Sequence, residues 1–276
     1  MHLIFADDSH QTTPTRLRMG PLAALGGIHV VDTEAGHLEH EIEHLCTQVG
    51  FSPGEEFKWS PRRTSWMFSN LHAPERDELF ASVLTTARYH LVQVTVVAAD
   101  ASCRRANPTS SSCDHDVTTL FLERVELALR AAGTTGMVVI DRPGGGQQAG
   151  KRLLAACKNT VTVGTRFVRP RCITDVELAW SATARQFPRL LQLADLVTGC
   201  TLARVAGSPW AVPAFEFIRP LLRSDGRRIG GVGLKLHPDY TLANLYHVLV
   251  GDGELWKGMS GWPLPRRDLP YFEDAS

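Results

Sequence analysis

The stretch HLIFADDSH, residues 2–10, decides how this chain is expected to fold. Its apolar run from Leu3 to Phe5 is typical of a central β-strand, and Asp7 and Asp8 follow where that strand is expected to leave the core. MVVID, residues 137–141, repeats the pattern and ends in Asp141. If the two strands are parallel neighbours, their carboxylates emerge at the same edge of the sheet, where open α/β sheets place ligands.

Strand and helix patterns alternate through the rest of the chain. Further strands are predicted at 26–32, 91–100 and 160–168, and helices at 37–49, 74–90, 116–133, 149–157, 188–207 and 242–251. This order predicts an α/β fold with a mixed β-sheet flanked by helices. Residues 1–206 are expected to form the main domain, and 207–276 a C-terminal extension packed on it.

A third acid lies in the predicted helix LLQLADLVTG, residues 190–199. Asp195 is surrounded there by Leu and Ala, so it is expected to be partly buried, where a lone charge is costly. Taken singly, Asp7, Asp8 and Asp141 are explained equally well as turn residues at strand ends, and Asp195 as an ion pair with an arginine such as Arg189.

Convergence of the three acids would favour a functional interpretation. Carboxylates that meet at one point raise one another's pKa unless a cation neutralises them. Mg²⁺ accepts a few carboxylate oxygens, and two such ions about 4 Å apart can clamp an in-line phosphodiester displacement. The expected chemistry is therefore metal-assisted hydrolysis of a phosphate ester.

Four motifs of the chain resemble those of the bacterial family catalogued as domain of unknown function 3800. They are Asp7-Asp8-Ser9-His10 for D-E-S-G, Glu56-Phe57-Lys58 for E-x-K, the strand ending in Asp141, and 191–199 for the helix L-Q-L-A-D-L-V-x-G. The resemblance covers residues 1–206. Asp8 replaces the usual Glu, which shortens the reach of the carboxylate, and His10 replaces the usual Gly.

The resemblance implies a ribonuclease H-like fold with an acid on the first strand, one on the fourth strand and one on a late helix. Asp7, Asp141 and Asp195 would hold two Mg²⁺ or Mn²⁺ ions. Glu56 or Asp8 would be a fourth acid, and Lys58 would contact a phosphate or the scissile oxygen.

The implied function is a metal-dependent, nuclease-like phosphodiesterase that acts on nucleic acid. Two further residues are candidates for roles in it. Glu123, in LERVE, is a further acid, although a helical Glu beside Arg124 is usually solvated. His10 is either a proton shuttle or a turn residue.

The alternative function is a catalytically silent ribonuclease H-like module that binds nucleic acid or a partner within a larger system. Lys and Arg number 29, as do Asp and Glu, so no basic field of the whole molecule attracts nucleic acid. Local arginines would have to do so, and the candidates are Arg62, Arg63, Arg104, Arg105, Arg166, Arg169 and Arg171. In the extension, Trp256 and Trp262 are expected either to pack or to stack on bases.

Composition also sets expectations about location. The six cysteines form no C-x-x-C pair, which favours reduced thiols. The apolar runs are too short to span a bilayer and the first residues lack the pattern of a signal peptide. We therefore expect a cytoplasmic protein without a membrane partner.

Three motifs imitate metal or nucleotide sites. HEIEH, residues 40–44, fits the zinc pattern H-E-x-x-H, but its histidines lie opposite an apolar stripe of Leu38, Ile42, Leu45 and Val49 and are expected to face water. Residues 145–151 fit the P-loop pattern G-x-x-x-x-G-K, but Arg152 stands where Ser or Thr must ligate Mg²⁺. Cys103, Cys113 and His115 share one loop, which is interpreted as a plain polar loop in preference to a metal site.

Overall fold

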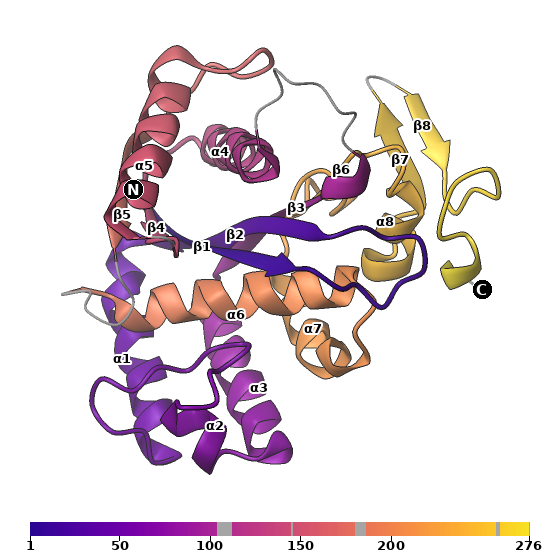
Figure 1. The fold of residues 1–276 in the computed structure, drawn as a ribbon. Helices are drawn as coiled ribbons and strands as arrows, with labels where there is room; N and C mark the ends of the chain where they lie inside the picture. Colours follow the sequence, from indigo (N-terminus) through magenta and orange to yellow (C-terminus); the bar gives the residue numbers. More distant parts are fainter. Residues whose placement is uncertain (104–111, 145, 180–185, 258–259, 276) are drawn as a thin grey trace.

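A mixed six-stranded β-sheet runs through the centre of the molecule (Figure 1). The structure is a computed structural model and describes residues 1–275 except 104–111, 145, 180–185 and 258–259. Its strands are β1 (His2–Gln11), β2 (Leu22–Val31), β3 (Gln93–Asp100), β4 (Gly136–Asp141), β5 (Ile173–Ala179) and β6 (Leu234–His237). They lie in the order β5-β4-β1-β2-β3-β6, and β2 is antiparallel to both of its neighbours while the other pairs are parallel.

Helices cover both faces of the sheet (Figure 1). On one face lie α4 (Cys113–Ala131) and α5 (Gly146–Val163), and on the other lie α1 (Asp32–Gln48), α2 (Trp66–Asn70), α3 (Ala73–Tyr89), α6 (Pro188–Val205) and α7 (Val212–Ile218). The chain continues with α8 (Ala243–Val250) and the small hairpin of β7 (Glu254–Lys257) and β8 (Ser260–Pro263). The predicted α/β fold with a mixed sheet flanked by helices is therefore confirmed.

Alternation along β1 divides its side chains between two hydrophobic cores. Phe5 belongs to the core shared with α1, α3 and α6, whereas Ile4 and Ala6 belong to the core under α4 and α5. Because successive strand residues point to opposite faces, Asp7 is directed to the α6 side and Asp8 to the α4 side. This parity decides which of the two acids can meet Asp195.

The first strand is longer than the sequence predicts. Asp7 and Asp8 lie within β1, which continues to Gln11 because β2 pairs with it along its whole length. The pairing of β1 with β4 stops earlier, at Ala6 and Ile140. The expectation that β1 ends at these acids is thus wrong. Only the pairing of β1 with β4 ends just before them.

The strand predicted at 160–168 is also wrong. Helix α5 continues to Val163, and Gly164 with φ +85° ends it. β-branched residues such as those in TVTV are tolerated in a helix when packing supports it, so the pattern was ambiguous. The strand that follows is β5, which pairs in parallel with β4.

Residues beyond 206 contribute to the central sheet. β6 pairs with β3, and Leu234, Leu236 and Tyr246 belong to the same core as Phe5. The helix predicted at 242–251 is confirmed as α8, while the domain boundary at 206 stays a prediction.

The two extension tryptophans are half-buried and packed. Trp256 lies under the guanidinium of Arg228, and Trp262 contacts Tyr240 and Arg266. Both rings therefore pack against other side chains, while stacking on bases stays a prediction. In the described part of the chain, no helix has the length and apolar character needed to cross a bilayer.

Candidate functional site

Two acids come side by side from neighbouring parallel strands. β1 and β4 pair Ala6 with Ile140, so the next residue of each strand, Asp7 and Asp141, are adjacent and share a face of the sheet. Both are 8% exposed. The Asp8 N–H donates to Asp7 Oδ1 at 2.8 Å and the Arg142 N–H to Asp141 Oδ1 at 2.9 Å, which fixes one oxygen of each carboxylate.

The third acid comes from α6, which packs across β1 and β2. Gly26 of β2 pairs with Asp7, and a Cβ there would lie 2.6 Å from Thr198 Oγ1. Only glycine therefore allows this approach of the helix. Asp195, one turn before Thr198, is half-buried and faces the strand acids.

Helix α6 also holds the loop that carries Lys58. Three of its side chains, one turn apart, contact the backbone of residues 55–59. Arg189 donates to Glu55 O at 2.7 Å, Gln192 Oε1 accepts from Phe57 N–H at 3.3 Å, and Asp195 Oδ2 accepts from Trp59 N–H at 2.7 Å.

Gly199 completes this contact one turn further on. A Cβ at Gly199 would lie 2.8 Å from the Trp59 ring, so the glycine makes room for the ring on the helix. The apolar helix motif with Gln192, Asp195 and Gly199 therefore has a structural reason: it is the surface on which the loop 55–59 is laid.

Lys58 lies among the acids as a result. Burial by itself lowers the pKa of Lys58, but the charges of Asp195, Glu56, Asp7 and Asp141 raise it above its usual value. The ammonium group is thus a permanent cation at neutral pH and partly neutralises the acids.

The acids interact with one another as well. Burial first, and then the charges of Asp195, Asp141 and Asp8, raise the pKa of Asp7 well above its usual range, while Lys58 opposes them. Burial also raises the pKa of Asp195, which the Trp59 N–H and Lys58 lower and Asp141 and Glu56 raise. Asp7, Asp141 and Asp195 are therefore mutually close enough for each charge to act on the other two.

The three acids suit a metal ion by their chemistry but are not yet arranged around one. Carboxylate oxygens are the ligands that Mg²⁺ and Mn²⁺ prefer, so the three acids fit such an ion chemically. Within the described residues, however, no group of three or more His, Cys, Asp or Glu side chains is already arranged as a ligand set. A cation would have to draw these side chains together, and once bound it would neutralise the repulsion between Asp141 and Asp195.

Asp8 and His10 lie apart from this group, on the α4 side of the sheet. His10 Nδ1 lies 3.4 Å from Asp8 Oδ2 and His10 Nε2 lies 2.9 Å from Asp114 Oδ1. The hydrogen bond with Asp8 is the main cause that raises the pKa of His10 to about 9, against burial, with Asp114 adding to it. His10 is a strand residue paired with Ala23, so the prediction of a turn residue is wrong.

Other sequence predictions have clear outcomes. His37, His40 and His44 are exposed on α1, as expected, although Val49 of the predicted apolar stripe is 37% exposed. Glu123 was expected on a solvated face, which is wrong: it is 3% exposed and accepts a hydrogen bond from Thr165.

The P-loop-like stretch and the cysteine loop lie partly outside the described residues. Gly145 of the P-loop-like stretch and 104–111 of the cysteine loop, including Arg104 and Arg105, are among those not described. Lys151 and Arg152 of the P-loop-like stretch are exposed on α5.

The alternative explanation for Asp195, an ion pair with Arg189, is wrong. The Arg189 guanidinium contacts Glu43 Oε2 at 2.6 Å and Gln192 Oε1 at 2.7 Å. Sequence reasoning missed the role of Arg189 and Gln192 in holding the loop. The available signal was a polar Gln192 within an otherwise apolar helix face.

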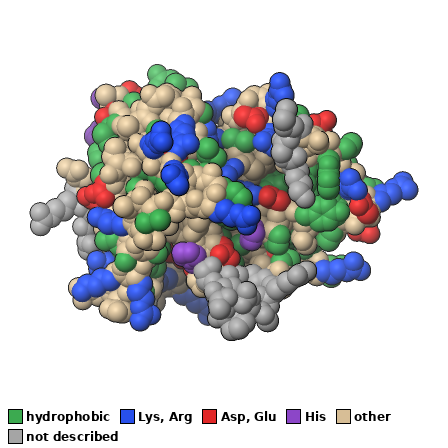
Figure 2. Space-filling view, turned by 90° about the horizontal axis from the view of Figure 1, so that it is seen from above, with side chains coloured by type: hydrophobic (Ala, Val, Ile, Leu, Met, Phe, Trp, Pro, Cys, Tyr) green, Lys and Arg blue, Asp and Glu red, His purple; other side chains and the backbone are tan. Residues whose placement is uncertain are grey.

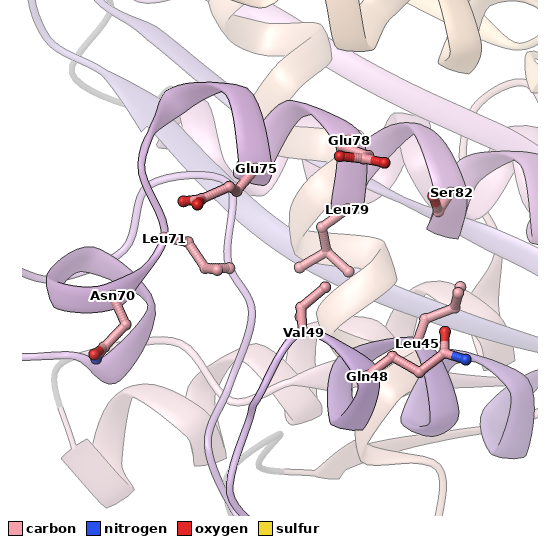
Figure 3. Close-up of a pocket in the computed structure, with 9 residues that line it drawn as sticks. All are labelled: Leu45, Gln48, Val49, Asn70, Leu71, Glu75, Glu78, Leu79 and Ser82. Atoms are coloured by element: carbon pink, nitrogen blue, oxygen red, sulfur yellow. The ribbon is translucent and has the colours of Figure 1, made fainter.

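One cavity lies away from the acids, between α1 and α3 (Figure 3). Its volume is about 390 Å³ and it is lined by Leu45, Gln48, Val49, Asn70, Leu71, Glu75, Glu78, Leu79 and Ser82. Figure 3 shows Glu75 and Glu78 at its rim and leucines inside it, without the mixture of acids and a cation found around Lys58.

Charged side chains are dispersed on the surface. Figure 2 shows Lys and Arg side chains spread among acidic, histidine and apolar ones on the face seen from above. This agrees with the net charge of zero.

Comparison with known proteins found no matching family model, and the search of curated proteins found no match.

Proposed function

We propose that this protein is a Mg²⁺- or Mn²⁺-dependent phosphodiester hydrolase that acts on nucleic acid through two metal ions. The observation that carries the proposal is geometric: the register of β1 with β4 sets Asp7 beside Asp141, and α6, packed on β1, brings Asp195 and the loop that carries Lys58 to them. The raised pKa values of Asp7 and Asp195 support it. Clustered carboxylates have no value for a surface that only binds phosphates, because they repel them.

The arrangement in the chain supports a ribonuclease H-like assignment. Asp7 lies on the first strand, Asp141 on the fourth and Asp195 on a late helix, which is the distribution that the resemblance implies. The mixed sheet flanked by helices is compatible with it.

In this proposal Asp7, Asp141 and Asp195 hold the ions. Bound divalent ions would supply an activated water and neutralise charge on the phosphate. Glu56 is the fourth acid, because its charge acts on Asp195 and Lys58, whereas Asp8 is engaged with His10 on the other side of the sheet.

Lys58 has a separate role, which the chain itself defines. Its ammonium, held by the loop that α6 binds, is placed to contact a phosphate oxygen and to orient the substrate. His10 receives no catalytic role, since both ring nitrogens contact carboxylates.

The direct test is incubation with labelled RNA, DNA and hybrid substrates in Mg²⁺ or Mn²⁺. Asp7→Asn and Asp195→Asn should each lower cleavage at least about 100-fold, because a lost ion ligand removes several kcal/mol of transition-state stabilisation. Asp77→Asn, at an exposed position of α3, is the matched control and should cleave as the wild type does.

A second measurement separates the proposal from its alternative. Mn²⁺ should raise the melting temperature of the wild type by mass action, and Asp141→Asn should remove the increase. Absence of both cleavage and a Mn²⁺ response at millimolar metal would instead favour the catalytically silent binding module.

A further inference from the structure

An arginine-lined groove lies at the C-terminal end of α6. The loop after β1 crosses this end, and the segment 267–275 lies beside the loop (Figure 1). The groove has a volume of about 900 Å³, and four arginines line it: Arg16, Arg18, Arg204 and Arg267. They come from three separate parts of the chain, so no local sequence pattern reveals them.

One arginine of the groove has a structural explanation. Arg16 Nε donates to Val205 O at 3.0 Å, and the Arg16 N–H donates to Ala206 O at 2.9 Å, so this residue caps the last carbonyls of α6. Its side chain is 8% exposed and forms an ion pair with Asp274.

The other three arginines are not explained by capping. Arg18 and Arg267 are exposed, and Arg204 is half-buried in the last turn of α6. Burial first, and then the charge of Arg204, lower the pKa of Arg16, so the two guanidinium groups lie close enough to repel each other.

The acids of the groove do not fully balance this charge. Three acids line it, Asp268, Glu273 and Asp274, against four arginines. Asp268 is engaged by Arg266, which does not line the groove, through contacts of 3.0 and 2.7 Å. Two carboxylates therefore face four guanidinium groups, and the groove has an excess of positive charge.

The geometry points to a binding groove for the backbone phosphates of a nucleic-acid strand, in which the Asp274 carboxylate takes the place of a phosphate until a strand displaces it. Guanidinium groups bind phosphates in a planar, two-contact manner that lysine cannot reproduce, and four of them suit more than one phosphate. The inference rests on the proposed function for the identity of the strand.

The groove lies apart from the acids along α6. Arg204 follows Asp195 by nine residues of the same helix, which is about 14 Å along its axis at about 1.5 Å per residue. Nine residues are also about two and a half turns, so Arg204 leaves the helix on the side away from Asp195. In the proposal the groove therefore binds phosphates separate from the one at the acids.

The test measures binding without cleavage. A labelled single-stranded oligonucleotide is titrated with the full chain in EDTA, and anisotropy is recorded at several salt concentrations. The double variant Arg18→Ala/Arg204→Ala, which leaves the capping residue Arg16 intact, should weaken binding at least about tenfold. It should also reduce the slope of log K against log salt by about 0.7 per lost contact.

Two further variants make the result specific. Arg76→Ala/Arg88→Ala removes two arginines from α3 and should leave affinity and salt slope unchanged. Asp274→Asn, which keeps the shape of the side chain without its charge, should strengthen binding several-fold. Equal effects of the two double variants, or no gain from Asp274→Asn, would overturn the inference.

The source of the phosphate is tested by competition. Inorganic phosphate, at the same concentration of phosphate groups, should displace the oligonucleotide poorly, because it cannot fill several positions at once. Displacement by equimolar inorganic phosphate would overturn the assignment to a strand.

The two proposals can fail separately. Loss of binding in the groove variant without any cleavage by the wild type would leave the groove standing and remove the nuclease. Metal-dependent cleavage by the wild type, with unchanged binding in the groove variant, would support the nuclease and contradict the binding groove.

Discussion

Asp7 occupies a position that disfavours its own charge. It is buried, and the charges of three further acids, Asp195, Asp141 and Asp8, act on it, so its pKa is raised well above 3.8. An acid with a raised pKa in the folded state destabilises the fold once it ionises. A cation bound beside Asp7 would instead favour its ionised form. The effect of Asp7 on the stability of the fold therefore reports on the charges around it.

Asp7→Asn should stabilise the metal-free protein at pH 7 by about 1–2 kcal/mol. Asn keeps the oxygen that accepts the Asp8 N–H but cannot carry the charge. The unfolded chain loses its proton near pH 3.8 and the folded one at higher pH, so the wild type loses stability as pH rises through this interval. The advantage of the variant should therefore be absent below about pH 4 and complete above the folded pKa.

Urea denaturation in EDTA at pH 4 and pH 7 measures this difference. Asp77→Asn on α3 serves as the control and should change neither value. An Asp7→Asn variant that is less stable than the wild type at pH 7 would contradict the electrostatic description of the site.

His10 makes the opposite contribution to pH dependence. Its folded pKa of about 9 lies above the unfolded value of 6.5, because Asp8 and Asp114 favour its charged form. The stabilisation is complete below pH 6.5 and is lost as pH rises through about 9.

His10→Gln should therefore destabilise the protein at pH 6 and have no effect at pH 10. The side chain is half exposed, so solvent screening limits the difference to about 1 kcal/mol or less. Chemical denaturation at the two pH values checks it, with His37→Gln on the exposed face of α1 as control. A difference that is equal at both pH values would show that the ion contacts of His10 are not its cause.

At the scale of elements, α6 organises the candidate site. It supplies Asp195, and its side chains at 189, 192 and 195 hold the backbone of the loop that carries Lys58. Because one rigid helix positions both the acid and the lysine, a change in the fit between helix and loop should alter the site without touching a charged group.

Two helical glycines provide a matched test of this fit. Gly199→Ala should destabilise the protein by about 1–3 kcal/mol, since the new methyl group meets the Trp59 ring at 2.8 Å and displaces the loop. Gly36→Ala on α1 meets nothing within 4 Å and should stabilise by up to about 1 kcal/mol through helix propensity. Thermal melts report both changes, and the Mn²⁺ response should decline only in the Gly199 variant. Equal effects of the two changes would contradict the packing argument.

At the scale of the whole molecule, the central sheet is completed from the end of the chain. β6 covers the edge of β3 through residues Val96 to Ala99, and Leu222 forms a further bridge with Val94. Without these residues β3 would present an unpaired, apolar edge to water.

A chain that ends at residue 206 should therefore lose cooperative unfolding. Removal of the later residues exposes part of one continuous core, which includes Leu234, Leu236 and Tyr246. Near-UV circular dichroism and urea denaturation of the shortened and full chains measure the effect. A cooperative transition and a native near-UV spectrum in the shortened chain would instead support an independent domain up to residue 206.

Features that depend on neighbouring residues were predicted correctly, and features that depend on distant residues were not. The strand at 137–141 and the helix that contains Asp195 are confirmed, because uninterrupted apolar runs and helical periodicity are properties of neighbouring residues. The strand predicted at 160–168 was wrong because β-branched residues allow either a helix or a strand. Glu123 was wrongly expected to face solvent because its hydrogen-bond partner, Thr165, lies 42 residues away in the sequence.

By itself the sequence determined the alternating elements, the alignment of Asp141 with a strand end and the position of Asp195 on an apolar helix. The tertiary structure alone decided which acids approach one another. The register of β1 with β4 sets Asp7 beside Asp141, the parity of β1 turns Asp8 to the opposite face, and Gly26 admits α6. The physical reason is that electrostatic interaction depends on distance in space, whereas a sequence pattern reports only distance along the chain.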